Sequence, residues 1–312
     1  MRGRGRLIAM LALLLALSGC RPLVTDGEKD ISIYATTYPI YALADALMEG
    51  VPNARLHCLI QPQDGCMRSY QLSDWDIYLL ANSADAVIAG GRGLESFEST
   101  LFSWGDKGPA VSAVLYNLEL YEGQSAGETT SEDASHLEGP NPHLYMSVDG
   151  VEAMLEAVSG TLMALDPRYG ELYADNEVRA EAALEGLRAR MEGVKATCGG
   201  SRVILMNEAL IYLALDCGLE VADWVDRESG VALYGSDLED MLARLGKSNA
   251  KVVLIERQAP ASLVEALREN GYSVALIDIL STHREGEGFD TYIHAQEDNA
   301  DAVLRAFEEV AH

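Results

Sequence analysis

Short apolar runs alternate with helical patterns through the first third of the chain. The runs are rich in β-branched residues, which is typical of buried strands. Between them, apolar residues recur every three or four positions, as on one face of a helix. The predicted strands are residues 31–35, 55–60, 85–89 and 110–115, and the predicted helices between them are 39–48 and 72–82. Strands that alternate with helices indicate βαβ units and a parallel sheet.

A polar segment and a long helix separate this region from a second one of the same kind. Residues 122–139 are rich in Ser, Thr, Gly and acidic residues without an apolar period, which predicts a loop. A helix over 147–165 and a longer one over 166–197 follow. The alternation then returns, with strands at 202–206, 251–255 and 272–277 and helices at 207–216, 236–245, 260–270 and 298–310. We expect an α/β protein with lobes at 31–165 and 198–312, joined by the helix 166–197.

The first 30 residues have the features of an export signal. Three arginines precede an apolar run over residues 7–17, which is too short to span a bilayer. Leu17-Ser18-Gly19-Cys20 then resembles the bacterial lipobox, in which the Cys is diacylated and becomes the new N-terminus. We expect a signal peptide at 1–19 and a lipid-anchored tether at 20–30. The mature chain would lie outside the cytoplasmic membrane, or in the periplasm if the host has an outer membrane.

Charge and cysteine content narrow the class of partner. The formal net charge is −26, which argues against nucleic acid and favours cations. Besides Cys20 the chain has Cys58, Cys66, Cys198 and Cys217. Because an exported compartment permits disulfides, Cys198 and Cys217 are a candidate pair that closes a short loop.

Several segments, taken in order, resemble one known family. They are ATTYPIY at 35–41, GRGLE at 91–95, NPHLY at 141–145, DPRY at 166–169 and VLIE at 253–256. Together they resemble the cluster A solute-binding lipoproteins of ABC importers for zinc, manganese and iron. The resemblance implies two lobes, each a four-stranded parallel sheet with helices outside, and a stiff linking helix. It also implies an ABC permease as partner and a metal held between the lobes.

The family uses four metal ligands, and two of them have clear counterparts. The second family His matches His143, and the final carboxylate matches Asp278, which follows the strand predicted at 272–277. The first family His stands two residues before a Tyr. Aligned on Tyr70, that position is Arg68, whose guanidinium cannot ligate a metal. The third position falls on Asn207 and Glu208 instead of a His.

Two interpretations of these departures stay open. In the first, the site is rebuilt from Cys66 or Asp64, His143, Glu208 or Asn207, and Asp278, a set that favours Zn²⁺, with Mn²⁺ or Fe²⁺ as alternatives. In the second, the site no longer takes a bare cation. Arg68, with Tyr70 nearby, would then pair with a small anion or with a carboxylate-bearing chelator around a metal.

An enzymatic function has no support in the sequence. The chain has no H-E-x-x-H, G-x-S-x-G or P-loop pattern. A surface adhesin role is compatible with the anchor, but no residue pattern points to it. We therefore expect a binding protein that works as a monomer.

Overall fold

The first lobe is built on a four-stranded parallel sheet. The computed structural model describes residues 30–61, 69–122, 140–225, 230–281 and 287–311. The strands are β1 (Ile31–Ala35), β2 (Ala54–Cys58), β3 (Ala86–Ala89) and β4 (Ala110–Ala113), in the order β2-β1-β3-β4. All three pairings are parallel, so the four carboxyl ends meet at one edge of the sheet. The α/β class and the four strands predicted here are confirmed.

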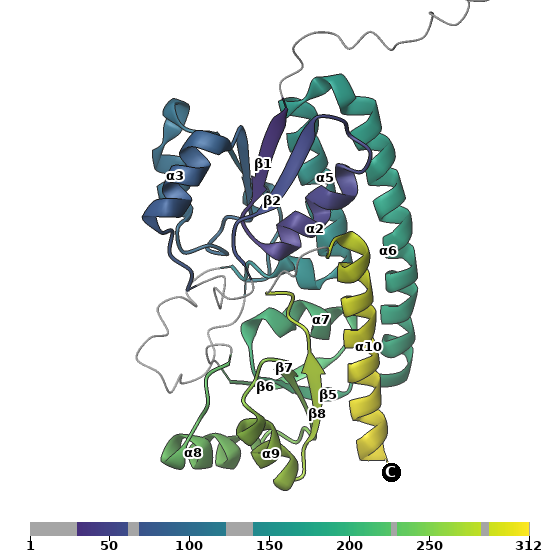
Figure 1. The fold of residues 1–312 in the computed structure, drawn as a ribbon. Helices are drawn as coiled ribbons and strands as arrows, with labels where there is room; N and C mark the ends of the chain where they lie inside the picture. The colour runs from purple at the N-terminus through teal and green to yellow at the C-terminus, as the bar shows by residue number, and fades with distance from the viewer. Residues whose placement is uncertain (1–29, 62–68, 123–139, 226–229, 282–286, 312) are drawn as a thin grey trace, which may run out of the picture. The chain divides into compact units, whose positions relative to one another are not determined.

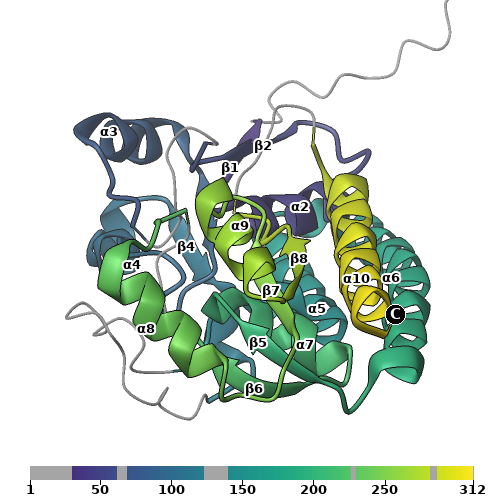
Figure 2. The ribbon, with the colours of Figure 1, turned by 90° about the horizontal axis from the view of Figure 1, so that it is seen from below.

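Helices cover both faces of this sheet. The helices of this lobe are α2 (Tyr38–Leu47), α3 (Asp74–Ser83), the short α4 (Glu98–Ser103) and α5 (Val148–Leu165). Helices α2 and α5 pack on each other on one face, and α3 and α4 lie on the other (Figures 1 and 2). A capping box between Ser73 and Asp76 fixes the first turn of α3.

The second lobe repeats the plan. Its strands are β5 (Arg202–Leu205), β6 (Glu220–Trp224), β7 (Val252–Glu256) and β8 (Ser273–Ile277), in the order β6-β5-β7-β8 and all parallel. Its helices are α7 (Ile211–Asp216), α8 (Gly235–Leu245), α9 (Ala261–Glu269) and α10 (Phe289–Ala311). Strand β6 is additional to the three strands predicted here, and α10 begins at Phe289 rather than at 298.

One long helix links the two lobes. After a 3-10 turn at Pro167–Tyr169, α6 runs over Gly170–Cys198, and its 29 residues span about 43 Å. Its buried positions recur every three or four residues and are Tyr173, Asn176, Ala180, Leu184, Leu187, Met191, Val194 and Cys198. This face packs on α5 and α10 (Figure 1), so the linker is supported by both lobes. The predicted linking helix is confirmed.

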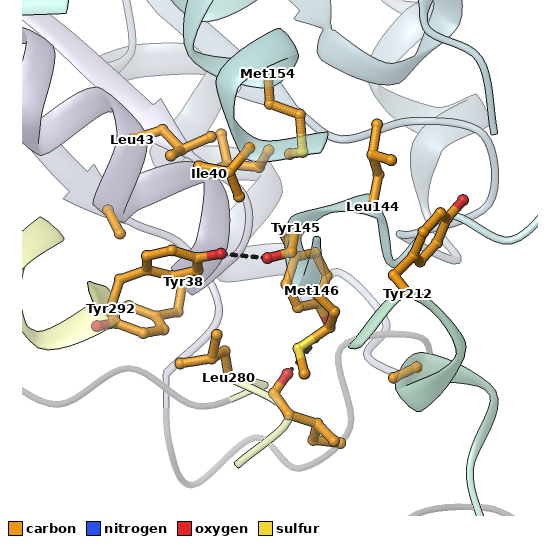
Figure 3. Packing of buried hydrophobic residues seen from close by; sticks show 14 of the residues in the cluster. Tyr38, Ile40, Leu43, Leu144, Tyr145, Met146, Met154, Tyr212, Leu280 and Tyr292 are labelled. Carbon is orange, nitrogen blue, oxygen red and sulfur yellow. Dashed lines mark hydrogen bonds between the residues drawn. The ribbon is translucent and has the colours of Figure 1, made fainter. Parts of the chain in front are cut away.

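Buried tyrosines fasten the lobes to each other. Tyr145 precedes α5, and its hydroxyl donates to the carbonyl of Ile279 at 3.2 Å, just beyond β8. In return, the hydroxyl of Tyr292 on α10 donates to the carbonyl of Tyr145 (Figure 3). Both rings are fully buried, within a hydrophobic core that includes residues of both lobes.

A carboxylate of the second lobe caps a helix of the first. Asp216, at the end of α7, accepts from the Ser147 hydroxyl at 3.0 Å and from the Val148 backbone N–H at 2.8 Å. Val148 is the first residue of α5, whose early N–H groups have no partner within the helix. The start of α5 is therefore completed by the other lobe.

The lobes also meet where the chain enters α10. The Tyr38 hydroxyl donates to the Gly288 carbonyl at 3.3 Å, and the Phe289 N–H donates to the Asp45 carboxylate at 3.4 Å. A side chain at Gly288 would overlap this carboxylate, because its Cβ would fall on Asp45 Oδ2. Glycine at this position thus lets α2 and the start of α10 approach this closely while Asp45 keeps its place.

Replacing Gly288 by alanine should lower the free energy of unfolding by about 1–3 kcal/mol, because the added methyl group must displace Asp45. Chemical denaturation would measure this. Gly160→Ala is the matched control, since nothing lies within 4 Å of a Cβ there and the site is inside α5. It should stabilise by about 0.5–1 kcal/mol. Equal effects at both glycines would contradict the proposed overlap.

Candidate metal-binding site

His143 lies on a tightly held loop just before α5. It follows Pro142 and is 5% exposed. Its backbone N–H donates to Asn141 Oδ1 at 2.9 Å, and its ring Nδ1 lies 2.9 Å from the same oxygen. Because an amide oxygen only accepts, Nδ1 carries the proton and the ring lone pair is on Nε2. A neutral imidazole oriented by a polar group in this way is the form that ligates metals.

Asn141 also ties the His143 loop to the second lobe. Its Nδ2 donates to the backbone carbonyl of Glu208 at 2.8 Å, and its own carbonyl accepts from the Tyr212 hydroxyl at 2.8 Å. The segment after β5, which carries Asn207 and Glu208, therefore lies against the His143 loop. This brings two of the predicted ligand positions together.

Asn207 and Glu208 differ in burial and in hydrogen bonding. The side chain of Asn207 is buried, and its Oδ1 accepts from the Ala209 N–H at 2.9 Å, which caps the 3-10 turn at Glu208–Leu210. That local role competes with metal ligation. Glu208 is partly exposed at the start of the same turn. Of the two, Glu208 is the better candidate ligand.

Asp278 lies immediately beyond β8, at the carboxyl edge of the second sheet. Its Oδ1 accepts from the Leu280 N–H at 2.9 Å, and its Oδ2 lies 3.5 Å from Arg257 Nη1. Asn299 on α10 holds its backbone with hydrogen bonds of 2.8 Å to both the N–H and the carbonyl. The position of Asp278 is thus fixed, but its carboxylate is already paired with Arg257.

The His143 and Asp278 loops lie side by side. The His143 ring is edge-on to Tyr145 with ring centroids 5.9 Å apart, and Tyr145 reaches the residue after Asp278 through the bond described above. Within the described ranges, however, no three His, Cys, Asp or Glu side chains are grouped closely enough to hold one ion. Asp64, Cys66 and Arg68 lie outside the described residues.

Tyr70 is placed by local structure. Its hydroxyl donates to Asp76 Oδ2 at 2.8 Å, next to the capping box of α3, and its ring lies edge-on to Phe97 with centroids 5.9 Å apart. Burial acts to raise the pKa of Asp76, but hydrogen bonds from Ser73 and Tyr70 bring it below the usual value. Tyr70 thus supports the start of α3.

Comparison with known proteins decides the family. The family described as zinc-uptake complex component A, periplasmic, matches residues 33–306, which is nearly all of both lobes. The chain belongs to this ZnuA family. A relative described as a putative metal-binding protein from Treponema pallidum is 22% identical over 230 residues, which are 72% of each chain.

Solved structures share the ZnuA-family fold. The solute-binding protein FpvC of Pseudomonas aeruginosa, in complex with Ni²⁺, superimposes with a TM-score of 0.74 at 23% identity, over 90% of this chain and 98% of that one. The Zn(II)-bound ZnuA-like domain of AdcA from Streptococcus pneumoniae gives 0.72 at 21% identity, over 89% and 98%. At these identities the likeness establishes the fold.

Two of the segments that resemble the ZnuA family form one buried brace. Glu95 is 2% exposed and accepts from the Thr36 hydroxyl at 2.5 Å and from the N–H groups of Gly90 and Gly91, each at 2.8 Å. Burial raises its pKa, against these hydrogen bonds. Thr36 directly follows β1 and Gly90 directly follows β3, so the brace fixes two loops at the carboxyl edge of the first sheet.

Sequence reasoning missed the acidic surroundings of Tyr38. Burial raises the pKa of this phenol, and the nearby charges of Glu287, Asp278 and Asp45 raise it further. The carboxylates that act on this phenol therefore come from both lobes. The only sequence signal was the position of Tyr38 within the segment 35–41. Their joint negative potential suits a ZnuA-family cation cargo.

The disulfide expected between Cys198 and Cys217 is not formed in this structure. Both are unpaired and buried, and Cys217 Sγ lies 3.9 Å from Met191 Sδ. Burial raises the pKa of Cys217 to about 12, with further contributions from Asp216 and Cys198. Because a thiolate is needed to form a disulfide, this environment disfavours the reaction.

Proposed function

We propose that this protein captures a divalent transition metal outside the cytoplasmic membrane and delivers it to an ABC permease. As a ZnuA-family member it is a metal-binding component of an uptake system. One observation carries the more specific proposal: the buried His143, held in the metal-ligating tautomer by Asn141, on a loop beside that of Asp278. The remaining ligands would come from Glu208 and from Cys66 or Asp64.

Zinc is the favoured cargo, and manganese is next. Imidazole and thiolate donors suit zinc, whereas a site made of carboxylates and one His would suit manganese or iron. Solved relatives carry Zn(II), Mn²⁺ or Ni²⁺, so this fold accommodates several divalent ions. The choice depends on whether Cys66 or Asp64 completes the set.

Metal-stripped protein should be stabilised by its cargo, since a ligand that binds only the folded state shifts unfolding. A free ion concentration 1,000 times Kd gives about 4 kcal/mol. Thermal unfolding with Zn²⁺, Mn²⁺, Fe²⁺ and Mg²⁺ in turn, together with elemental analysis of the protein as isolated, would rank the ions. A melting temperature unmoved by all three transition metals would rule out capture of a bare ion.

A second candidate cargo is a metal chelate or a small anion. Arg257 Nη1 lies 3.5 Å from Asp278 Oδ2, and Arg68, which is outside the described residues, would be a second guanidinium for such a cargo. Guanidinium groups bind carboxylates in a bidentate way. For such a cargo, Arg68→His should abolish uptake of the native ligand.

The substitution Arg257→Gln separates the two cargoes. For a bare cation, it removes a competitor for the Asp278 carboxylate. Binding should then tighten by up to about five-fold, because an exposed ion pair is worth at most roughly 1 kcal/mol. For an anionic chelate, binding should weaken instead. Isothermal titration would show whether the affinity rises or falls. Arg268→Gln, at an exposed position on α9, is the control, because it removes the same charge elsewhere.

Anchoring through a diacylated Cys20 and a monomeric state complete the proposal. No helix in the described part of the chain is long and apolar enough to cross a bilayer. Mass spectrometry of the mature N-terminal peptide would test lipidation directly. Cys20→Ala should release the protein from the membrane fraction. The family acts in uptake, and we propose no catalytic role.

A further inference from the structure

The outer helical layer of the first lobe carries exposed aromatic side chains. On α3, Trp75 is 65% and Tyr78 58% exposed, and their rings stack with centroids 5.6 Å apart at 24°. Phe102 on α4, at 45%, and Tyr116 after β4, at 51%, form an edge-on pair with centroids 6.1 Å apart. We call these four residues the aromatic face.

Three of these residues, Trp75, Tyr78 and Phe102, belong to the helices on one side of the lobe. Helices α3 and α4 lie together on the sheet face opposite α2 and α5 (Figures 1 and 2). Gln71, just before α3, donates to the Ser96 hydroxyl at 3.0 Å, just before α4. The buried residues of helix α3 are Asp76 and Leu80. The outward aromatics are therefore not needed to pack this helix.

The chemistry of the aromatic face suits the headgroup region of a bilayer. Trp and Tyr combine an apolar ring with a polar N–H or O–H, and they are enriched where membrane meets water. The net charge of −26 disfavours attraction to anionic lipids. A contact made by aromatic rings would instead be nearly independent of salt, since it does not rely on charge.

The first lobe begins at β1, next to the end of α3. Asp85, two residues after α3 ends, accepts from the Ser32 N–H at 3.0 Å through its side chain, and its own N–H donates to the Ser32 carbonyl at 2.8 Å. Ser32 is the second residue of β1, where the tether ends. From Cys20 to Ile31 the chain can reach at most about 36–40 Å, and α3 is only about 15 Å long. The aromatic face is therefore within reach of a membrane that holds Cys20.

We propose that the aromatic face rests in the headgroup region of the membrane to which the protein is anchored. This contact would orient the first lobe with α3 and α4 toward the membrane surface. The proposal depends on the lipidation of Cys20 proposed above. It is independent of the identity of the cargo.

The test uses the full lipidated chain in phosphatidylcholine vesicles and the fluorescence of single tryptophans. With Trp104→Phe and Trp224→Phe, Trp75 is the only reporter, and we expect brominated lipids to quench it. The control keeps only Trp224, on β6 of the second lobe, and should be unaffected. Should either set fail to fold, Trp75→Ser with Tyr78→Ser in an otherwise unchanged chain should remove the quenching seen in the wild type.

Flotation of the same vesicles separates the two proposals. A chain that floats with the vesicles but shows no quenching of Trp75 overturns the bilayer contact and leaves the anchor intact. A chain that fails to float and lacks acyl groups on Cys20 overturns both. If Trp75 is shielded from aqueous iodide without quenching by brominated lipid, a second copy of the chain covers the face and the membrane assignment is wrong.

Discussion

Replacing His143 by alanine should weaken binding of the cognate metal ion by more than about 100-fold, since losing even an outer-shell partner of a ligand costs 10- to 100-fold. The imidazole is buried and oriented by Asn141, so no nearby water can reproduce its geometry. Isothermal titration of metal-stripped protein would measure the change. The fold should survive, because the backbone bond from His143 to Asn141 does not need the ring.

His294→Ala is the matched control for this experiment. His294 is exposed on α10, where its Nδ1 pairs with Glu297 at 3.1 Å, and its loss should leave affinity unchanged. Asn141→Ala should lie between the two, because it removes the group that fixes the His143 tautomer. If His143→Ala binds metal as the wild type does, the assignment of the site to this loop is wrong.

Replacing Glu95 by alanine should lower the free energy of unfolding by about 3–5 kcal/mol. The substitution leaves three buried donors, on Thr36, Gly90 and Gly91, without their acceptor. Glu95→Gln keeps the shape of the side chain, but its N–H₂ group faces one of these donors and cannot accept from it. The free energy of unfolding should therefore fall by about 1–3 kcal/mol. Urea denaturation would measure both.

The effect of Glu95 should also depend on pH. Burial raises its pKa in the folded state, so the folded protein holds the proton more tightly than the unfolded chain. Its contribution is therefore full below the unfolded value of about 4.5 and falls as the pH rises through the folded pKa. The stability gap between wild type and Glu95→Gln should shrink from acid to neutral pH. Glu269→Gln, at an exposed position on α9, is the control, and a gap that widens would contradict this account.

Segments with a clear period of apolar residues were predictable from sequence. Helices and strands whose inward face carries polar residues were not. Strand β6 was missed because Glu220 and Asp223 interrupt its apolar pattern at the edge of the sheet. The first turns of α10 were missed because polar Gln296 lies on its inner face. There its amide donates to the Tyr145 carbonyl at 3.2 Å, which no local pattern records.

The same limit applies to the candidate site. His143 and Asp278 could be found because each follows a recognisable local segment. The contacts that join these two loops to other segments could not be found, because they span long sequence separations. Arg257 meets Asp278 from the neighbouring strand, and Asn141 meets Glu208 from the other lobe. The ligands proposed at Asp64 and Cys66 stay predictions.

The cap that Asp216 places on α5 bears on how the chain folds. Helix α5 packs in the first lobe, yet the N–H of its first residue, Val148, gains its acceptor only after the second lobe has formed and brought α7 into place. The two halves should therefore unfold in a single calorimetric transition. A fragment that ends before α7 should behave as a partly ordered chain with a frayed α5, although it contains every strand of its own sheet.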